Sequence, residues 1–364
     1  MKKLFSVLMV LVSVFAIAGC STISDTDVTT ESTTDQIAVE AVEVVPVELE
    51  DKVVVYSTHS EAMLEMVATE FEKETGVKVE FINLKGELAD RVRAEVENPQ
   101  SDVMFGAASS VFLELKEENL FEAYEPAWSS MVNPLFKDEE HYFFGTIQTP
   151  VVMFYNTDVI AKEDAPKDWL DLADDKYRNQ FVFRNALSSS ARATYSALLQ
   201  QYEKQGDLGA GWTYLSALDA NTKQYFASGS LQFQAIGRKE AGISFATLSS
   251  VIDNRENNDI PLEIVNATSG SPVITDCIGL INGAKHPNAA KAFIEFAGGE
   301  KIQTMFANEF NRMPTHQEAI QNAPEWMGNI ELNIMDVDWG KLSKAQSEWM
   351  QTWDNDIKDT QKDS

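Results

Sequence analysis

Short apolar runs alternate with amphipathic segments through most of the chain. Val53, Val54 and Val55 form a β-branched run that is typical of a buried parallel strand. The predicted elements are, in order, a strand over 52–56, a helix ending at Gly76, a strand over 77–82, a helix over 87–97 and a strand over 102–105. This β-α-β-α-β order indicates an α/β fold with a largely parallel sheet.

A similar alternation returns after residue 150. Strands are predicted over 150–155, 180–184, 242–245, 261–265 and 276–281. Helices are predicted from Lys167 and over 191–203, 212–218, 230–238, 287–298, 300–308 and 341–357. Thr58 and Glu61 have the S/T-x-x-E spacing of a capping box, which predicts reciprocal side-chain caps at the start of the first helix.

The N-terminal residues have the layout of an export signal. Lys2 and Lys3 precede an apolar run over 4–18, which is shorter than the roughly 20 residues of a transmembrane helix. Ile17-Ala18-Gly19-Cys20 resembles the lipobox of bacterial lipoproteins. The resemblance implies a signal peptide over 1–19, cleavage before Cys20 and lipidation of its sulfur. The alternative is an uncleaved anchor with an incidental cysteine.

The segment that follows Cys20 is acidic and polar. Residues 21–51 hold nine acidic and no basic residues, together with many Ser and Thr. We therefore predict a disordered tether over 20–51 between the lipid and the folded body, with a strand over 37–49 as the alternative. The expected location is the cell envelope, anchored by lipid at the outer face of the cytoplasmic membrane or in the periplasm.

Charge and motif content exclude several classes of protein. The chain has 57 Asp+Glu against 29 Lys+Arg, a net charge of -28, which disfavours nucleic acid as a partner. Cys20 and Cys277 are too few for a disulfide framework, and the four histidines form no HExxH motif. GxGxxG, GxxxxGK, GxSxG and CxxC are all missing. We expect no enzyme, no cofactor and no metal, and we expect Cys277 to be a buried, inert thiol.

The loops after the predicted strands share small polar residues. In open α/β sheets, ligands lie beyond the carboxyl ends of the strands, and helix starts there offer free N–H groups. The candidate ligand-binding residues are Ser57, Thr58, His59, Ala107, Ser109, Thr149, Asn185, Ser188, Ser189, Ser190, Ser228 and Thr247. This chemistry suits an oxyanion, whereas the alternative for each loop is helix capping alone. His59 could orient a ligand, bind a metal or belong to a capping turn.

Several stretches of the body together resemble a known family. They are VVVYSTHSEA (53–62), FEKETGVKVEF (71–81), SDVMFGA (101–107), VVMFYNTDVI (151–160), APKDWLDLADDKYRNQ (165–180), YFASGS (225–230) and INGAKHPNAAKAFIEFA (281–297). In order and spacing they resemble the substrate-binding proteins of bacterial ABC importers, in the branch of ferric-ion, phosphonate and sugar-phosphate binders.

The resemblance implies an α/β, two-lobed type II periplasmic binding protein fold. Each lobe would be a mixed, mostly parallel sheet flanked by helices, and two crossing strands would join the lobes. Lobe 1 would comprise 52–150 and 275–364, with its C-terminal helices packing across the lobes, and lobe 2 would comprise 151–274. The implied partners are an ABC permease and its ATPase, and the protein would act as a monomer.

Departures from the family pattern bear on the ligand. Ferric-ion binders use a histidine, a glutamate and two adjacent tyrosines. His59 matches the histidine and Glu61 is nearby, but Ala246-Thr247-Leu248 stands where the tyrosines would be. The His-Asp pair of sugar-phosphate binders is also missing, whereas Ser188–Ser190 resembles a phosphate-cradling loop. We expect a small anionic solute, phosphorylated or a phosphonate. A ferric-ion carrier and a surface sensor that feeds a receptor kinase are the alternatives.

Overall fold

The computed structural model describes residues 48–84, 87–186 and 188–363. The predicted signal peptide, Cys20 and the tether as far as residue 47 lie outside the described residues. Within the described part of the chain, no helix is both long enough and apolar enough to cross a membrane. Residues 48–51 precede the first strand, and the Glu50 carboxylate accepts hydrogen bonds from the backbone N–H groups of Asn288 and Ala289.

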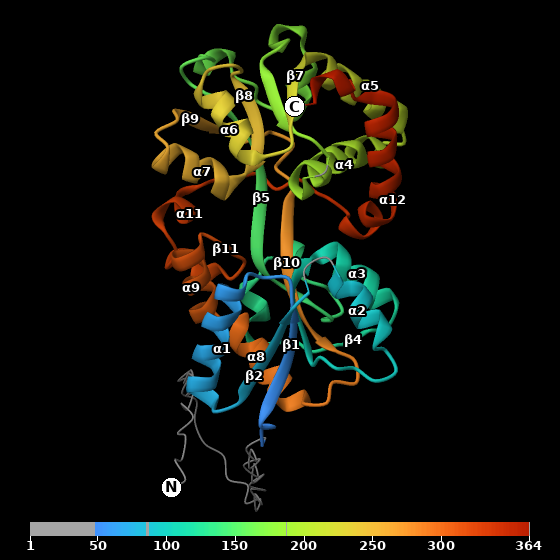
Figure 1. Ribbon diagram of the computed structural model, residues 1–364, viewed down its shortest axis with the longest axis vertical. Coiled ribbons are helices and arrows are strands. Elements are labelled where there is room, and N and C mark those ends of the chain that lie inside the picture. The colour runs from blue at the N-terminus through green and yellow to red at the C-terminus, as the bar shows by residue number, and fades with distance from the viewer. Residues whose placement is uncertain (1–47, 85–86, 187, 364) are drawn as a thin grey trace, which may run out of the picture. The chain divides into compact units, whose positions relative to one another are not determined.

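Lobe 1 is built on three parallel strands with an antiparallel neighbour (Figure 1). Its strands are β1 (Lys52–Ser57), β2 (Lys78–Asn83), β3 (Val103–Ala108), β4 (Phe121–Glu122), β10 (Val273–Ile281) and β11 (Met313–Pro314). Its helices are α1 (Glu61–Thr75), α2 (Leu88–Ala94), α3 (Ser109–Glu117), α8 (Pro287–Ala297), α9 (Glu300–Phe310) and α10 (Gln317–Gln321). The predicted β-α-β-α-β order is therefore present, with β1 and β3 mostly buried and β2 pairing with β1 as a largely uncovered neighbour.

Lobe 2 has a second sheet, in which β6 pairs in parallel with both β7 and β8. Its strands are β6 (Phe181–Arg184), β7 (Thr222–Phe226), β8 (Ile243–Thr247) and β9 (Leu262–Val265). Its helices are α4 (Ser189–Lys204), α5 (Leu208–Asn221), α6 (Gly229–Gly237) and α7 (Leu248–Asn257). We did not predict β7, because polar residues interrupt its apolar positions.

One long strand takes part in both sheets. β5 (Phe144–Asn156) pairs with β10 up to Pro150, then with β8 from Val151 and with β9 from Met153. β10 runs beside it into lobe 1, so these two strands connect the lobes (Figure 1). We predicted only the part of β5 from Pro150, because Gly145, Thr146 and Gln148 break the apolar pattern of a strand that is nonetheless almost wholly buried.

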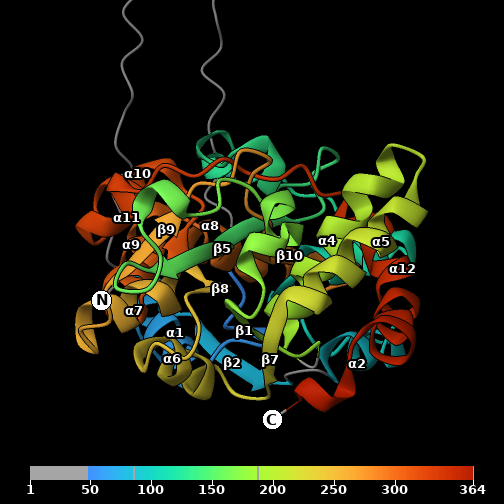
Figure 2. The ribbon, with the colours of Figure 1, turned by 90° about the horizontal axis from the view of Figure 1, so that it is seen from above.

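The C-terminal segment contacts both lobes. It comprises α11 (Glu325–Asn329), α12 (Trp339–Thr352) and a π-helical turn over Trp353–Ile357. α12 packs against α3 of lobe 1 and α4 of lobe 2, and Figure 2 shows it at one side of the body next to α4 and α5. Lys344 Nζ on α12 lies 2.7 Å from a carboxylate oxygen of Glu117 on α3, which adds an exposed ion pair to this packing.

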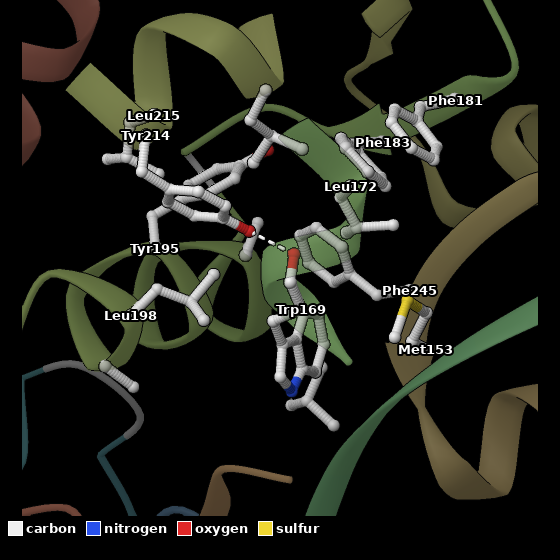
Figure 3. Close-up of a cluster of buried hydrophobic side chains, with 14 of the residues drawn as sticks. Met153, Trp169, Leu172, Phe181, Phe183, Tyr195, Leu198, Tyr214, Leu215 and Phe245 are labelled. Atoms are coloured by element: carbon white, nitrogen blue, oxygen red, sulfur yellow. Dashed lines mark hydrogen bonds between the residues drawn. The ribbon is translucent and has the colours of Figure 1, made fainter. Parts of the chain in front are cut away.

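An aromatic core supports the strands of lobe 2 (Figure 3). Trp169 and Tyr195 both pack edge-on against Phe245 of β8, and both are almost fully buried. The Tyr214 hydroxyl donates to the Trp169 carbonyl at 2.6 Å, and the Trp169 indole donates to the Gly270 carbonyl at 2.8 Å. Because these buried polar atoms are bonded, the core gives β6 and β8 a firm base beneath the loops at their ends.

Two local predictions are wrong. Thr58 and Glu61 form no capping box, since Ser60 is the N-cap residue of α1 and makes no side-chain cap bond. Thr58 Oγ1 instead accepts the Ala107 N–H at 2.7 Å, which ties the loops after β1 and β3 together. The helix predicted from Lys167 is only a 3-10 turn over Trp169–Ala173, although Asp168 gives it a complete capping box.

Candidate ligand-binding site

Three parallel strands of lobe 2 each lead into a helix at the same edge of the sheet. β6, β7 and β8 are followed by α4, α6 and α7, whose N-cap residues are Ser188, Ser228 and Thr247. All three N-cap residues have extended backbone angles, and none of their side chains caps its helix. The first N–H groups of three helices are therefore left to other partners, and each helix start adds partial positive charge.

A cavity of about 450 Å³ lies between these helix starts and the strands that join the lobes. Lobe 2 contributes Arg184, Ser188, Ser189, Ser190, Gly229, Gln232, Phe233, Ala246, Thr247 and Ser250. Thr149 of β5, Ile274 and Asp276 of β10, and Arg312 form the rest of the lining. Its size lies within the range of small-molecule sites.

Hydroxyl groups occur in pairs along the lobe 2 side of the cavity. Ser188 Oγ and Ser190 Oγ are 3.1 Å apart, and Thr247 Oγ1 and Ser250 Oγ are 2.7 Å apart. In each pair one hydroxyl donates to the other, so the second hydroxyl keeps its own proton for another acceptor. The pairs therefore add O–H donors to the backbone donors of α4 and α7.

Arg184, the last residue of β6, brings a full positive charge to this edge. Its Nη2 donates to the Ala227 carbonyl at 3.0 Å, while its Nε is buried and has no partner among the described residues. A Cβ added at Gly229 would lie 3.3 Å from Arg184 Nη1, so the guanidinium lies close to the start of α6. A guanidinium held in this way presents fixed donors to an oxyanion.

An ion pair forms the opposite side of the cavity. Arg312 follows α9, and its Nη2 donates to Asp276 Oδ2 at 2.8 Å. The side chains are partly exposed, 35% for Arg312 and 19% for Asp276, whereas Arg312 Nε is buried without a partner in the described structure. Arg184 and Arg312 thus face one cavity that also contains a single carboxylate among its described lining residues.

His59 is close enough to this ion pair for both of its members to affect the pKa of the imidazole. Burial lowers the pKa of His59 to about 4, with Asp276 opposing the shift and Arg312 adding to it. The ring packs edge-on against Phe105, with centroids 4.6 Å apart, and its Nε2 has no partner among the described residues. His59 is therefore neutral near pH 7 and contributes no charge to the cavity.

Most of the other predicted residues of lobe 1 take part in hydrogen bonds within and between the loops of β1 and β3. Ser57 Oγ accepts the His59 N–H at 3.1 Å, and Thr58 Oγ1 accepts the Ala107 N–H at 2.7 Å. Ala107 has a positive φ of 76° just before α3, which begins at Ser109. The cavity lining of this structure does not include Ser57, Thr58, His59, Ala107 or Ser109. The bond between Thr58 and Ala107 ties the loops of β1 and β3 together.

Of the predicted residues, Thr149, Ser188, Ser189, Ser190 and Thr247 come together around the cavity. Asn185 and Ser228 flank it, and Asn185 Oδ1 is buried without a partner in the part of the chain described here. The prediction missed Arg184, Gln232, Asp276 and Arg312. The sequence could have identified Arg184, because it is a cation at the carboxyl end of a predicted buried strand. Nothing in the sequence places Arg312 beside β10.

The cavity continues into a groove between α6 and α7. This extension, of about 560 Å³, shares Gly229, Phe233 and Ser250 with the main cavity. Its sides carry Asp253 and the amides of Gln234, Asn254 and Asn258, while Phe233 and Ile260 supply apolar surface. The whole depression is therefore much larger than a single inorganic anion needs.

Comparison with known proteins places this geometry in a family. A family model described as bacterial extracellular solute-binding protein matches residues 66–332, more than half of the chain. The chain belongs to this family. This solute-binding protein is 28% identical over 321 residues to a probable ABC transporter periplasmic-binding protein of Sinorhizobium fredii, covering 85% of this chain and 87% of the relative.

Solved structures share the fold of the solute-binding protein. The ferric iron-binding protein A of Mannheimia haemolytica, in an open conformation, has a TM-score of 0.71 and 21% identity, over 84% of this chain and 98% of that one. The periplasmic binding protein AfuA of Actinobacillus pleuropneumoniae, with fructose-6-phosphate bound, has a TM-score of 0.61 and 23% identity over the same shares. The predicted two-lobed type II fold is confirmed.

The comparisons also establish the general role. The protein is a solute-binding protein of an ABC importer and acts in the periplasm or outside the cell. Its partners are the permease and the ATPase of the importer. Its relatives are binding proteins rather than enzymes, which confirms that expectation. The identity of the solute depends on the chemistry of the cavity.

Proposed function

We propose that this protein binds the phosphoryl or phosphonate group of a small solute between its lobes and delivers the solute to an ABC permease. The observation that carries the proposal is the convergence of three helix N-termini and Arg184 on one cavity. Backbone N–H groups at helix starts, hydroxyls and a guanidinium are the donors that bind phosphate in other proteins. The fructose-6-phosphate of the AfuA structure supports the same ligand class.

Unsatisfied polar atoms support a ligand at this place. Buried atoms without a partner among the described residues include Arg184 Nε, Asn185 Oδ1, Arg312 Nε and His59 Nε2, and all four residues line or adjoin the cavity. Buried polar atoms are rarely left unbonded, because losing water without gaining a partner costs about 1–3 kcal/mol each. An oxyanion would accept from the guanidinium groups of both lobes.

A ferric ion is the competing cargo, favoured by the name of the Mannheimia haemolytica structure. The donor set fits it poorly. No group of three His, Cys, Asp or Glu residues within the described ranges could hold a metal ion. Asp276 already pairs with Arg312, and two guanidinium groups would repel a trivalent cation. Where the family pattern has two tyrosines, Ala246 and Thr247 line the cavity instead.

The decisive experiment is a thermal-shift screen followed by isothermal titration calorimetry. The full-length protein is screened against phosphate esters, phosphonates, polyols and ferric citrate. A true ligand at 100 times its Kd should raise the free energy of unfolding by about 2.7 kcal/mol. A phosphate ester or phosphonate should give the largest shift. Stabilisation by ferric citrate alone, with a visible charge-transfer band, would refute the proposal in favour of iron.

A double variant tests the serine loop directly. Ser189→Ala with Ser190→Ala removes two hydroxyls from the start of α4, which should weaken phosphoryl binding by about 10- to 100-fold. Ser216→Ala is the matched control, because Ser216 lies on the exposed face of α5 and its Oγ donates to the Trp212 carbonyl. Unchanged calorimetric affinity in the double variant would show that the serine loop does not hold the ligand.

We also propose that the mature protein is a monomer that is anchored to the membrane through lipid on Cys20. The sequence around Cys20 supports the anchor, and a two-lobed body that surrounds its own ligand needs no second copy. Replacing Cys20 with Ser should release the protein from the membrane fraction, and mass spectrometry of the wild type should find acyl chains on residue 20. A variant that stays in the membrane fraction would point to the uncleaved anchor.

A further inference from the structure

One carboxylate stands in a cavity that is otherwise rich in hydrogen-bond donors. Among the described lining residues of the 450 Å³ cavity, Asp276 is the single Asp or Glu, opposite Arg184 and the starts of α4 and α7. A carboxylate repels a bound anion, so its presence in an anion site is unfavourable unless it makes a favourable contact with the ligand. The surroundings of Asp276 indicate what that task is.

The two carboxylate oxygens of Asp276 have different environments. Oδ2 accepts from Arg312 Nη2 at 2.8 Å, while Oδ1 has no hydrogen-bond donor among the described residues. With 19% of its area exposed, the side chain is mostly shielded from solvent and yet reaches the cavity. Oδ1 is therefore available as an acceptor for a group that enters the cavity.

The backbone at Asp276 is held from both sides. β10 shifts its register against β5 between Asp276 and Cys277, and against β3 between Asp276 and Ile278. The Thr146 hydroxyl also donates to the Asp276 carbonyl at 3.3 Å. A bulge in a strand re-aims a side chain, and here it does so between two paired neighbours, so the direction of the carboxylate is fixed.

We infer that Asp276 makes the site select anions that carry a hydrogen-bond donor. An ionised carboxylate only accepts hydrogen bonds. An oxyanion without a proton would bring one of its oxygens against Asp276 Oδ1 with no hydrogen between them, and the two negative oxygens would repel each other. Phosphate keeps an acid proton near neutral pH, and hydroxyl- or amino-bearing phosphate esters bring further donors. Sulfate has the same tetrahedral shape and no proton. The inference rests on the proposed binding of an oxyanion in this cavity and adds a rule for which oxyanion is accepted.

Phosphate and sulfate are therefore the probes. Isothermal titration calorimetry at pH 7 and constant ionic strength measures the Kd of each anion for the full-length protein. We expect the wild type to prefer phosphate by about 10- to 100-fold, the effect of one hydrogen bond to a charged group. Asp276→Asn supplies an amide that donates, so the preference should fall to within about threefold of equality.

A matched control separates this local effect from charge. Asp175→Asn also removes one negative charge, but Asp175 is exposed, pairs with Arg178 and lines neither the cavity nor the adjoining groove. It should change the affinities for both anions alike and keep the wild-type ratio.

The outcomes distinguish the two proposals. Equal affinities in the wild type, or an unchanged ratio in Asp276→Asn, would overturn the selectivity and leave the anion site in place. If neither anion binds and no phosphate ester or phosphonate stabilises the wild type, the anion site and the selectivity both fall. Binding of a phosphate ester without either inorganic anion would overturn the selectivity alone. The wild-type ratio decides even if Asp276→Asn fails to fold, which circular dichroism would reveal.

Discussion

Arg184 is the residue whose replacement should weaken ligand binding most. Its Nη2 is already fixed on the Ala227 carbonyl at 3.0 Å, so little side-chain entropy is lost when it binds an anion. A hydrogen bond to a charged partner contributes about 1.5–3 kcal/mol. The Coulomb attraction of two unit charges about 4 Å apart near a protein surface sets an upper bound of about 4 kcal/mol.

Arg184→Gln should therefore cost about 2–4 kcal/mol of binding free energy, which raises Kd by about 30- to 1,000-fold. Arg184→Lys keeps the charge and loses the planar fork, so its Kd should lie between those of the wild type and Arg184→Gln. The assay is calorimetric titration with the phosphate ester that stabilises the wild type most. The thermal midpoints without ligand verify that each variant is folded.

The control for this series is Arg238→Gln. Arg238 lies just past the C-terminal end of α6 and pairs with Glu240 at 2.7 Å, so its loss removes a positive charge from lobe 2 without touching the cavity. Its affinity should match that of the wild type within about twofold, since distant exposed charges are screened. If Arg184→Gln binds as tightly as Arg238→Gln, the argument that Arg184 holds the anion is refuted.

Three further predictions concern stability and reactivity. Gly270→Ala should lower the free energy of unfolding by about 2–5 kcal/mol, because Gly270 has φ +91° and a Cβ would lie 2.4 Å from the Met335 nitrogen. Gly76→Ala is the control: Gly76 has φ +77° but open space where a Cβ would lie, so the same denaturant titration should show a loss of only about 1–2 kcal/mol. The pKa of His59 in the folded protein is about 4, below its ordinary value of 6.5. Between these values the unfolded chain takes up a proton that the folded chain does not, so the free energy of unfolding should fall by about 3 kcal/mol as the pH drops from 6.5 to 4. Denaturant titrations at several pH values should show a flatter profile for His59→Gln, and equal slopes would contradict this origin. Burial raises the pKa of the Cys277 thiol, so in a Cys20→Ser background it should react with Ellman's reagent only after unfolding; rapid labelling of the native protein would contradict its burial.

Local sequence patterns predicted those parts of the fold and site that depend on neighbours in the chain. Val53 to Val55 read as a buried strand because their apolar side chains carry that information themselves. Ser188 to Ser190 were identified because a loop between a strand and a helix start offers N–H donors whatever lies across from it. These inferences need no knowledge of tertiary contacts.

The remainder depends on segments that meet only in three dimensions. Arg312 reaches Asp276, which lies 36 positions earlier, because β11 and β10 both pair with β5. We predicted His59 and Thr58 as ligand-binding residues, and the fold bonds Thr58 to Ala107 and packs His59 against Phe105, outside the lining of the cavity. The sequence shows which functional groups a loop carries, whereas contacts with the neighbouring loop determine whether those groups are exposed to the cavity.

The two guanidinium groups inside the cavity also have a kinetic consequence. The whole chain carries a net charge of -28, whereas Arg184 and Arg312 are confined to one recess. An approaching anion is repelled at long range and attracted only within the last few ångströms. Added salt screens the repulsion over a distance of about 10 Å at 0.1 M, so capture becomes faster, while release also becomes faster as the contacts weaken. For an anionic solute of the proposed kind, a lower charge should therefore give faster entry, because the acidic exterior repels it less.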